Sequence, residues 1–359
     1  MELAEIALWA SGNTAASNLE RLRTAVTAFN NLPDIPSSEK EKAEFILTFL
    51  HRNILRTYSI YQTRVDTALT SGTFNCVSSA VLYMIFCEAA GIKTSGVITK
   101  DHAFIIVHID GQDIDVETTN RFGFDPGNRR EFHDQFGRLT GFSYVPAQNY
   151  RDRQTINKIE LISLIFKNRI ADNERRNNFS DPVPLVIDRF FLLLGEALNS
   201  SGVYSSESLF ADPHKELLDR LINYGASLLR ANREEDSLRW AEIASSRYPD
   251  PDINRWQEYT FTAVHNRITR FIRDRRIEDA KNFLETNKSL LSESNYDHIY
   301  NLIRINMAVE YHNRFAAEWN RRNYDEAERI LNEGLAEFPD NRQLLNNRET
   351  VNRHRAQRQ

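Results

Sequence analysis

The sequence predicts an α/β (α+β) domain followed by an all-helical domain. In the stretch Gly72 to Thr119, a cysteine-bearing helix pattern is followed by a β-hairpin pattern. Beyond about residue 151 the apolar residues recur almost throughout at helical spacing, and an approximate repeat appears towards the C-terminus. We therefore expect one domain over residues 1–200, with its core at about 40–125, and a second over residues 201–359.

Composition narrows the class of protein. The 359 residues, 41% of them apolar, are enough to form two cores. The net charge of −5 gives no electrostatic reason to expect binding to nucleic acid or to an anionic membrane. No apolar run has the length of a membrane span, and the start of the chain lacks a signal-peptide profile. We expect a cytoplasmic protein, or an extracytoplasmic one if an export signal has been removed.

Helical patterns precede the cysteine. Residues 1–30 carry an apolar stripe at helical spacing, and Pro33 and Pro36 then interrupt the chain. Ser38 and Glu41 match a capping box, which predicts the start of another helix. Its apolar positions are Ala43, Ile46, Leu47, Leu50 and Ile54.

Cys76 lies in the first turn of a predicted helix. Asn75 is a plausible N-cap, and Gly91 follows the apolar pattern where a C-terminal residue tolerant of positive φ is needed, so we expect a helix over residues 76–90. Unpaired backbone N–H groups and the helix dipole favour a thiolate at this end. Cys87 lies eleven residues further along, roughly 16 Å away, so the two cysteines cannot form a disulfide with each other. We interpret Cys87 as a small core residue.

Two acidic residues compete to orient a histidine in the predicted hairpin. Asp110-Gly111 between two runs rich in β-branched residues is a strong signal for a two-residue hairpin loop. That loop makes Glu117 a diagonal neighbour of His102, at roughly 7 to 8 Å between Cα atoms. Asp115 shares the face but lies one pair further away. Glu117 is therefore the preferred acid and Asp115 the reserve.

The three residue types suit nucleophilic catalysis for separate reasons. The Cys76 thiolate attacks a carbonyl, the His102 imidazole exchanges protons with the thiol and the leaving group, and a carboxylate fixes the ring tautomer. The alternative is a free cysteine at a helix start beside an ordinary strand histidine. The order and spacing of the three residues favour the catalytic interpretation.

Residues 40–125 resemble the transglutaminase-like superfamily of papain-type folds. The resemblance rests on a cysteine at a helix N-terminus, a strand opening with His-Ala-aromatic, a Gly-containing turn and a strand ending in Val-acidic-x-Thr. The superfamily includes transglutaminases, peptide N-glycanases, arylamine N-acetyltransferases and many bacterial cysteine proteases or amidases. The resemblance implies Cys76 as nucleophile, His102 as general base and Glu117 as orienting acid. This chain has Val-Glu-Thr-Thr in place of the usual Val-Asp-Pro-Thr, and Phe104 in place of the usual Trp.

Substrate contacts are predicted less directly. Gln62, in the connection to Cys76, is either an oxyanion donor or part of a solvated loop, and Phe104 is a second candidate for substrate contact. The aromatic-rich residues 121–150 are expected to fold over the edge of the active site and shape its pocket. No cofactor is implied. His133 and Asp134 are neighbours without further ligands, so we expect no metal.

The C-terminal repeat is similar to degenerate tetratricopeptide units. Two copies run with equal spacing from a small residue to a proline, from Ser237 to Pro249 and from Ala327 to Pro339, and a middle copy around Ala280 lacks the proline. Such a stack either offers a surface to a protein or peptide or buttresses the first domain. Two functions are therefore expected to compete. One is a cysteine peptidase, amidase or transglutaminase acting on a protein or peptide, and the other is a catalytically silent interaction protein.

Overall fold

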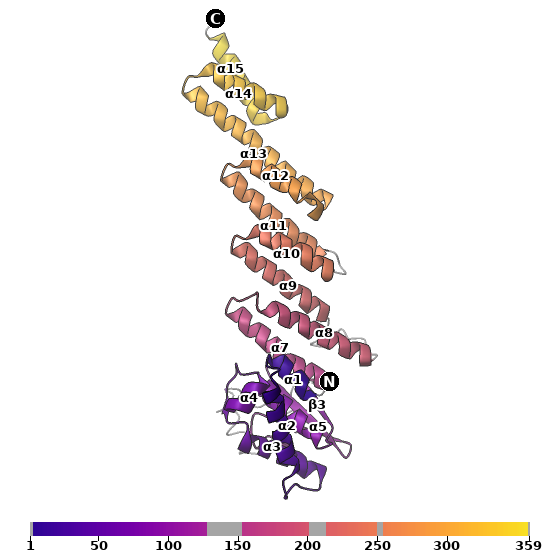
Figure 1. Cartoon of the computed structure of the whole chain (residues 1–359). Coiled ribbons are helices and arrows are strands. Elements are labelled where there is room, and N and C mark those ends of the chain that lie inside the picture. The colour runs from indigo at the N-terminus through magenta and orange to yellow at the C-terminus, as the bar shows by residue number, and fades with distance from the viewer. Residues whose placement is uncertain (1–2, 128–152, 201–212, 250–253, 358–359) are drawn as a thin grey trace. The chain divides into compact units, whose positions relative to one another are not determined.

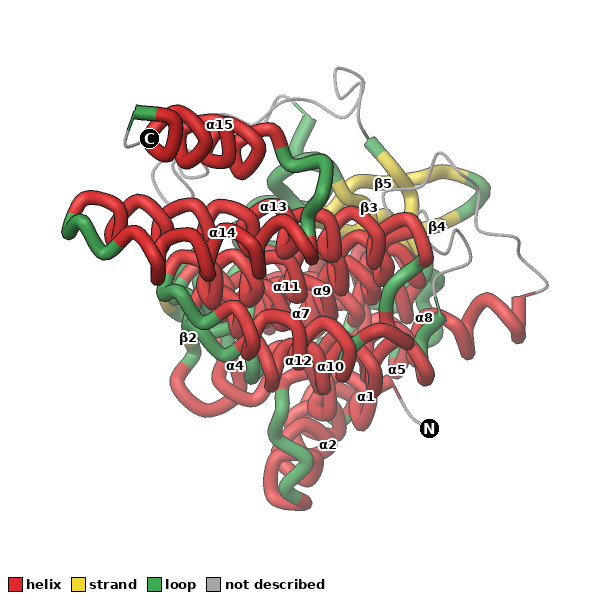
Figure 2. Tube along the Cα trace, turned by 90° about the horizontal axis from the view of Figure 1, so that it is seen from above, coloured by secondary structure: helices red, strands yellow, loops and turns green. Residues whose placement is uncertain are grey.

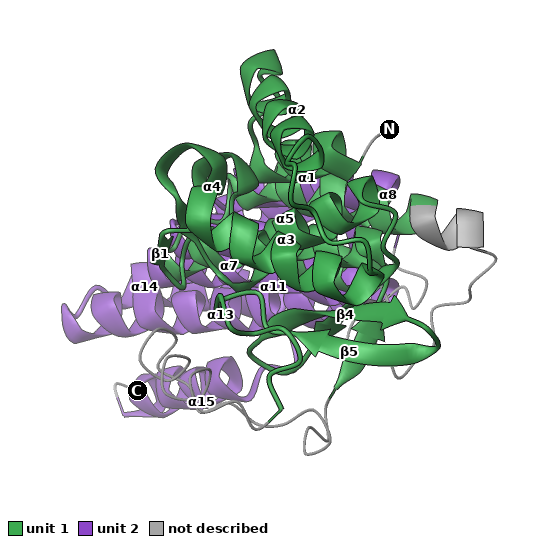
Figure 3. Cartoon of the chain, turned by 90° about the horizontal axis from the view of Figure 1, so that it is seen from below, with its two compact units in different colours: residues 1–220 green, residues 221–359 purple. Residues whose placement is uncertain are grey.

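The structure, a computed structural model, describes residues 3–127, 153–200, 213–249 and 254–357 (Figure 1). It confirms a mixed fold of helices with small β-sheets. Figure 3 shows its two compact units, Met1–Arg220 and Leu221–Gln359. The division falls inside helix α9 (Pro213–Arg230), later in the chain than the boundary at residue 200 expected from sequence. None of the described helices is both long and apolar enough to cross a membrane.

The N-terminal helical region of unit 1 is interrupted, although the sequence predicted helix throughout residues 1–30. Helix α1 (Leu3–Ser11) ends before Gly12, which adopts a φ of 78°, and helix α2 (Ala16–Asn30) begins after the turn. Helix α3 (Glu39–Asn53) begins as predicted, because the Ser38 side chain accepts a hydrogen bond from the Glu41 N–H.

Helix α5 (Cys76–Ala89) is the central helix of unit 1. Every residue from Val77 to Cys87 is buried, as expected of a helix that is apolar on nearly all sides. It packs against α3, α4 (Val65–Ser71), α7 (Lys158–Arg175) and two strands, β3 (Thr94–Ile98) and β4 (Ala103–Ile109). The Tyr83 hydroxyl donates to the Ala43 carbonyl at 3.0 Å and so ties α5 to α3. Outside this buried stretch, Cys76 at the N-terminal end is half-buried, and Glu88 and Ala89 at the C-terminal end are exposed.

The main sheet is antiparallel, with strand order β5-β4-β3-β6 (Figure 2). Its strands are β3 (Thr94–Ile98), β4 (Ala103–Ile109), β5 (Gln112–Val116) and β6 (Gln154–Ile156). Asp110 and Gly111 have φ values of 49° and 76° and form the predicted two-residue loop. Ile106 pairs with Asp115, which confirms the predicted register. A separate parallel pair joins β1 (Thr57–Tyr58) to β2 (Thr73–Phe74).

The sheet and helices of unit 1 meet closely at Gly96. A Cβ atom there would lie 2.8 Å from Cγ1 of Ile156 and 3.2 Å from Cβ of Leu161 on α7. Helix α7 in turn packs along helix α8 (Pro182–Ser200). These two helices lie in the part of the chain beyond residue 151 where apolar residues recur at helical spacing.

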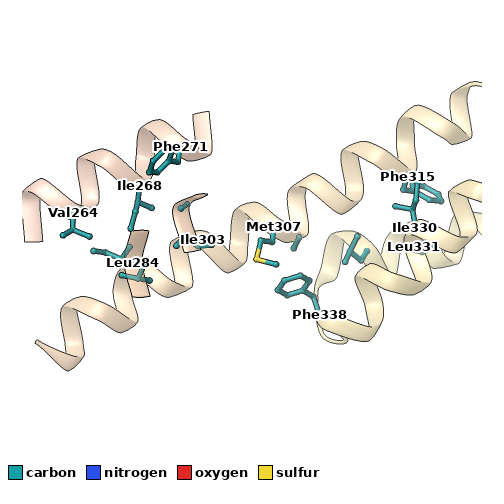
Figure 4. Packing of buried hydrophobic residues seen from close by; sticks show 14 of the residues in the cluster. Val264, Ile268, Phe271, Leu284, Ile303, Met307, Phe315, Ile330, Leu331 and Phe338 are labelled. Carbon is teal, nitrogen blue, oxygen red and sulfur yellow. The ribbon is translucent and has the colours of Figure 1, made fainter. Parts of the chain in front are cut away.

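Unit 2 is a succession of helices that pack against their neighbours in sequence. After α9 come α10 (Glu234–Arg247), α11 (Asn254–Arg273), α12 (Ile277–Thr286), α13 (Glu293–Asn320), α14 (Tyr324–Glu337) and α15 (Arg342–Ala356). One buried apolar cluster runs from α10 to α15, and Figure 4 shows Leu284 and Ile303 on facing helices within it. A core this continuous is characteristic of stacked helical hairpins.

The three small positions singled out in the repeat are equivalent in the structure. Ser237, Ala280 and Ala327 are each the fourth residue of their helix and are each 0% exposed. Each follows a turn with a left-handed residue, at Asn232, Arg275 and Arg322. Helices α10 and α14 also end just before Pro249 and Pro339, as predicted.

Candidate active site

Cys76 is the first residue of α5 and is half-buried, whereas Cys87 is fully buried. The Asn75 side chain accepts from the N–H groups of Val77 and Ser78, both at 3.0 Å, and the Ser78 hydroxyl accepts from the Asn75 N–H. This capping box leaves the Cys76 N–H without an acceptor among the described residues. The sulfur therefore lies at the positive end of the helix, beside an available backbone donor.

The same cap fastens the preceding loop. Asn75 Nδ2 donates to the Ile60 carbonyl at 3.2 Å, and the Ser78 hydroxyl lies 3.1 Å from the Gln62 carbonyl. Asn75 and Ser78 are almost fully buried. The capping residues thus fix both the direction of α5 and the loop that passes over its first turn.

His102 and Glu117 form a short, buried contact. His102 lies just before β4 and donates from Nε2 to Oε2 of Glu117 at 2.6 Å, with only 11% and 3% of the two side chains exposed. Glu117 Oε1 accepts from the Thr119 N–H at 3.0 Å and from the Thr119 hydroxyl at 2.6 Å. Both carboxylate oxygens are therefore held, and Nδ1 of His102 remains for the Cys76 sulfur.

The imidazole is strongly biased towards its charged form. Burial alone lowers the pKa of His102, but the charge of Glu117 and hydrogen bonds from the ring to Cys76 and Glu117 outweigh burial, so the pKa lies well above its ordinary value. Burial also raises the pKa of Tyr58, and the nearby negative charges of Cys76 and Glu117 raise it further. His102 is therefore favoured as an imidazolium ion that is hydrogen-bonded to Cys76 and Glu117.

Thr118, which follows Glu117 in the turn after β5, links this turn to two helices. Its hydroxyl lies 2.9 Å from the Ser79 hydroxyl on α5, and its carbonyl accepts from Nε2 of His51 on α3 at 3.0 Å. Glu117 is also packed against Gly123, where a Cβ atom would lie 1.9 Å from the Glu117 carbonyl oxygen. These contacts fix the position of the Glu117 backbone relative to α5.

The reserve acid, Asp115, is engaged elsewhere. Its carboxylate forms a bidentate ion pair with Arg153, one bond of which measures 2.8 Å. Arg153 also lies over the ring of Phe104, with 5.1 Å from its guanidinium carbon to the ring centroid. Phe104 is buried and stacks on His102 with ring centroids 6.2 Å apart. Phe104 thus supports the imidazole from behind and does not line the cavity described next.

A cavity of about 570 Å³ contains both Cys76 and His102. Ile60 and Tyr61 of the preceding loop line it, as do residues 98–103 and one face of α7. Gln62 is not among the lining residues, and its side-chain Oε1 accepts from the Arg64 N–H at 3.0 Å. The cavity is thus lined by Cys76 and not by Gln62.

Other expected features lie partly outside the described residues. The residues that lie outside are His133, Asp134 and most of the segment 121–150. Within the described ranges, no group of three or more His, Cys, Asp or Glu side chains is arranged to hold a metal ion.

Several residues of the site escaped the sequence interpretation. Ser79, Thr118 and His51 act through tertiary contacts, and so does the α7 wall of the cavity. One signal was available for the serines. Ser78 and Ser79 are consecutive polar residues in an otherwise apolar helix, and buried hydroxyls require hydrogen-bond partners.

Comparison with known proteins adds no assignment. The sequence matches no model of a known protein family, and no curated protein matches it. Function is therefore inferred from the geometry of the site.

Proposed function

We propose that this chain is a thiol-dependent acyl-transfer enzyme of the papain or transglutaminase type, acting on a protein or peptide. Cys76 is the nucleophile, His102 the acid-base residue and Glu117 the acid that orients it. One observation carries the proposal. The Cys76 sulfur contacts the His102 imidazole, which in turn contacts the buried Glu117 carboxylate, and Cys76 and His102 line one cavity. Peptidase, amidase and transglutaminase activities share this first half-reaction.

The geometry supports a two-step reaction. The Cys76 thiolate attacks a substrate carbonyl, and the negative charge that develops on the carbonyl oxygen is met by the Cys76 N–H at the start of α5. The His102 imidazolium then protonates the departing amine, and the carbon–nitrogen bond breaks to leave a thioester. In the second step neutral His102 takes a proton from water or an acceptor amine, which attacks the thioester and releases the thiolate.

Glu117 supports this cycle without taking the proton itself. Its Oε2 accepts from Nε2 of His102, which keeps Nδ1 directed to the sulfur, and its charge stabilises the imidazolium. Thr119 fixes the other oxygen, so the carboxylate keeps one orientation.

The fold is consistent with the same proposal. Helix α5 packs against an antiparallel sheet, in which His102 immediately precedes β4 and Glu117 immediately follows β5. In unit 2 we propose tetratricopeptide-like hairpins, supported by the equivalent buried positions of Ser237, Ala280 and Ala327. These hairpins would contact a protein or peptide partner.

Selective alkylation tests the proposed nucleophile. At mildly acidic pH, iodoacetamide should modify Cys76 rapidly and Cys87 hardly at all, because the first is accessible at a helix start and burial raises the pKa of the second. Peptide mass mapping over time separates the two cysteines within one sample. Equally slow alkylation of Cys76 and Cys87 would contradict an activated nucleophile at Cys76.

That negative result would favour the interaction-protein alternative. One observation supports this alternative on its own. Helix α13 exposes Ile305 (63%), Val309 (37%) and Tyr300 (42%) in unit 2. Exposed apolar side chains of this size are a common feature of protein-binding surfaces.

A further inference from the structure

One wall of the active-site cavity is a single stripe of helix α7. The residues that line it are Leu164, Lys167, Asn168, Ala171 and Arg175. Their spacing of i, i+3, i+4, i+7 and i+11 places them on one helical face. Because the same cavity contains Cys76 and His102, this stripe faces the space that a substrate would occupy.

The ionisable residues that line the cavity, apart from Cys76 and His102, are mostly cations. Lys100, Lys167 and Arg175 line it together with one acid, Asp101. The chain as a whole has a net charge of −5, so the sign of this cavity is opposite to that of the molecule. A concave site lined by one sign of charge concentrates ligands of the other sign.

The Arg175 side chain is held in place while keeping donors available. It contacts Oδ1 of Asp172 through Nη2 at 3.3 Å, and its guanidinium carbon lies 5.2 Å from the centroid of the Tyr61 ring. Asp172 also pairs with Arg176 through its other oxygen, at 2.7 Å. Asp172 is thus shared between two arginines and does not fully balance Arg175.

The positive charge of Lys167 is balanced by neighbouring acids less fully than that of Arg175. Within the described part of the chain, neither Lys167 nor Lys100 forms an ion pair. Burial lowers the pKa of Lys167, the charge of Glu216 opposes this, and Arg189 and Arg220 lower it further. Those two arginines are themselves paired with Glu216 and Glu174, so a carboxylate bound in the cavity would give Lys167 a direct ion-pair partner.

We propose that the substrate is an acidic peptide or peptide-like acyl donor whose carboxylates lie along α7. This inference rests on the proposed acyl-transfer function. Lys167 and Arg175 are about 12 Å apart along the helix axis, which corresponds to three or four residues of extended chain. The two cations therefore suit a segment with more than one carboxylate close to the bond that is attacked.

Paired alkylating reagents test this charge preference without knowledge of the natural substrate. Iodoacetamide is neutral and iodoacetate carries a carboxylate, yet both form the same sulfur–carbon bond and release iodide. The quantity to measure is the ratio of the iodoacetate rate to the iodoacetamide rate at Cys76, divided by the same ratio for a small free thiol. We expect this normalised ratio to exceed one and to fall as salt is added.

Charge-removing variants on α7 assign the preference to residues. Lys167→Gln and Arg175→Gln should each lower the ratio by roughly two- to fivefold, since each removes one nearby positive charge. Arg176→Gln is the matched control, because it removes the same charge one residue along the helix from a side chain outside the cavity. A short polyglutamate peptide should also slow iodoacetamide labelling of the unmodified chain more than a polyglutamine peptide does.

The outcomes separate this inference from the function on which it rests. Rapid iodoacetamide labelling of Cys76 with a normalised ratio of one or less would overturn the acidic-substrate proposal and leave the nucleophile intact. An equal effect of Arg176→Gln and the two cavity variants would also overturn it. Absence of labelling by either reagent would overturn both proposals together.

Discussion

Glu117 and Asp115 are two residues apart but have different partners. Asp115 lies in β5, and Glu117 directly follows the end of that strand. Glu117 is buried against His102 and Thr119, while Asp115 forms a bidentate ion pair with Arg153. The sequence placed both within reach of the imidazole and preferred Glu117. The structure supplies the reason why one carboxylate is available to the ring and the other is occupied.

Substitutions at the site should therefore follow a definite order. Cys76→Ala abolishes turnover, His102→Ala nearly does, and Glu117→Gln lowers kcat by roughly a hundred- to a thousandfold by disturbing the ring tautomer. Asp115→Asn has a smaller effect, because it acts only through Arg153 and Phe104. Turnover of one peptide substrate by the four variants checks the order, and a larger loss for Asp115→Asn than for Glu117→Gln would reverse the roles of the acids.

At the scale of elements, His51 joins α3 to the turn that follows β5, and this histidine is neutral in the folded state. Burial lowers the pKa of His51 to about 4, the hydrogen bond to the Thr118 carbonyl opposes this, and the charge of Arg121 adds to the lowering. As pH falls below about 6.5, the unfolded chain binds a proton before the folded protein does. The stability that depends on neutral His51 is therefore present above that pH and is lost towards pH 4.

His51→Gln should flatten this dependence, since the Gln amide can still donate to Thr118 but does not titrate. Between pH 7 and pH 5 the natural chain should lose about 2 kcal/mol more unfolding free energy than the variant. Urea denaturation of both proteins at the two pH values gives this difference. Parallel pH dependences would show that His51 does not contribute the acid sensitivity.

At the scale of the whole molecule, the helical unit depends on small residues at buried packing positions. Ala327 is 0% exposed within the apolar cluster of unit 2. Ala327→Leu should destabilise that unit by about 1 to 3 kcal/mol, because added volume in a packed core strains its neighbours.

The same variant distinguishes the two roles considered for unit 2. If the unit provides a partner surface, iodoacetamide labelling of Cys76 should keep its rate in Ala327→Leu under conditions where unit 2 is loosened. Hydrogen exchange of α14 and α15 monitors the loosening. A parallel fall in the Cys76 labelling rate would indicate that unit 2 buttresses the catalytic unit.

The sequence predicted features that depend on local chemistry. The start of α5, the loop at Asp110-Gly111 and the buried small residues of the repeat follow from caps, turn preferences and periodicity. The break at Gly12, the pairing of β6 and the partner of Asp115 depend on segments far apart in the chain. The cationic residues of α7 that line the cavity were not predicted for the same reason, because helical spacing does not show which face of a helix lines a cavity.

The pH dependence of Cys76 alkylation tests the central proposal most directly. If Cys76, His102 and Glu117 act as one unit, the iodoacetamide rate should stay nearly level from pH 8 down to about pH 5.5, because the imidazolium holds the thiolate. In His102→Ala the rate should instead fall about tenfold per pH unit below roughly pH 8, as for an ordinary thiol, with Glu117→Gln between the two. A tenfold fall per unit in the natural chain, coinciding with both variants, would contradict the proposal.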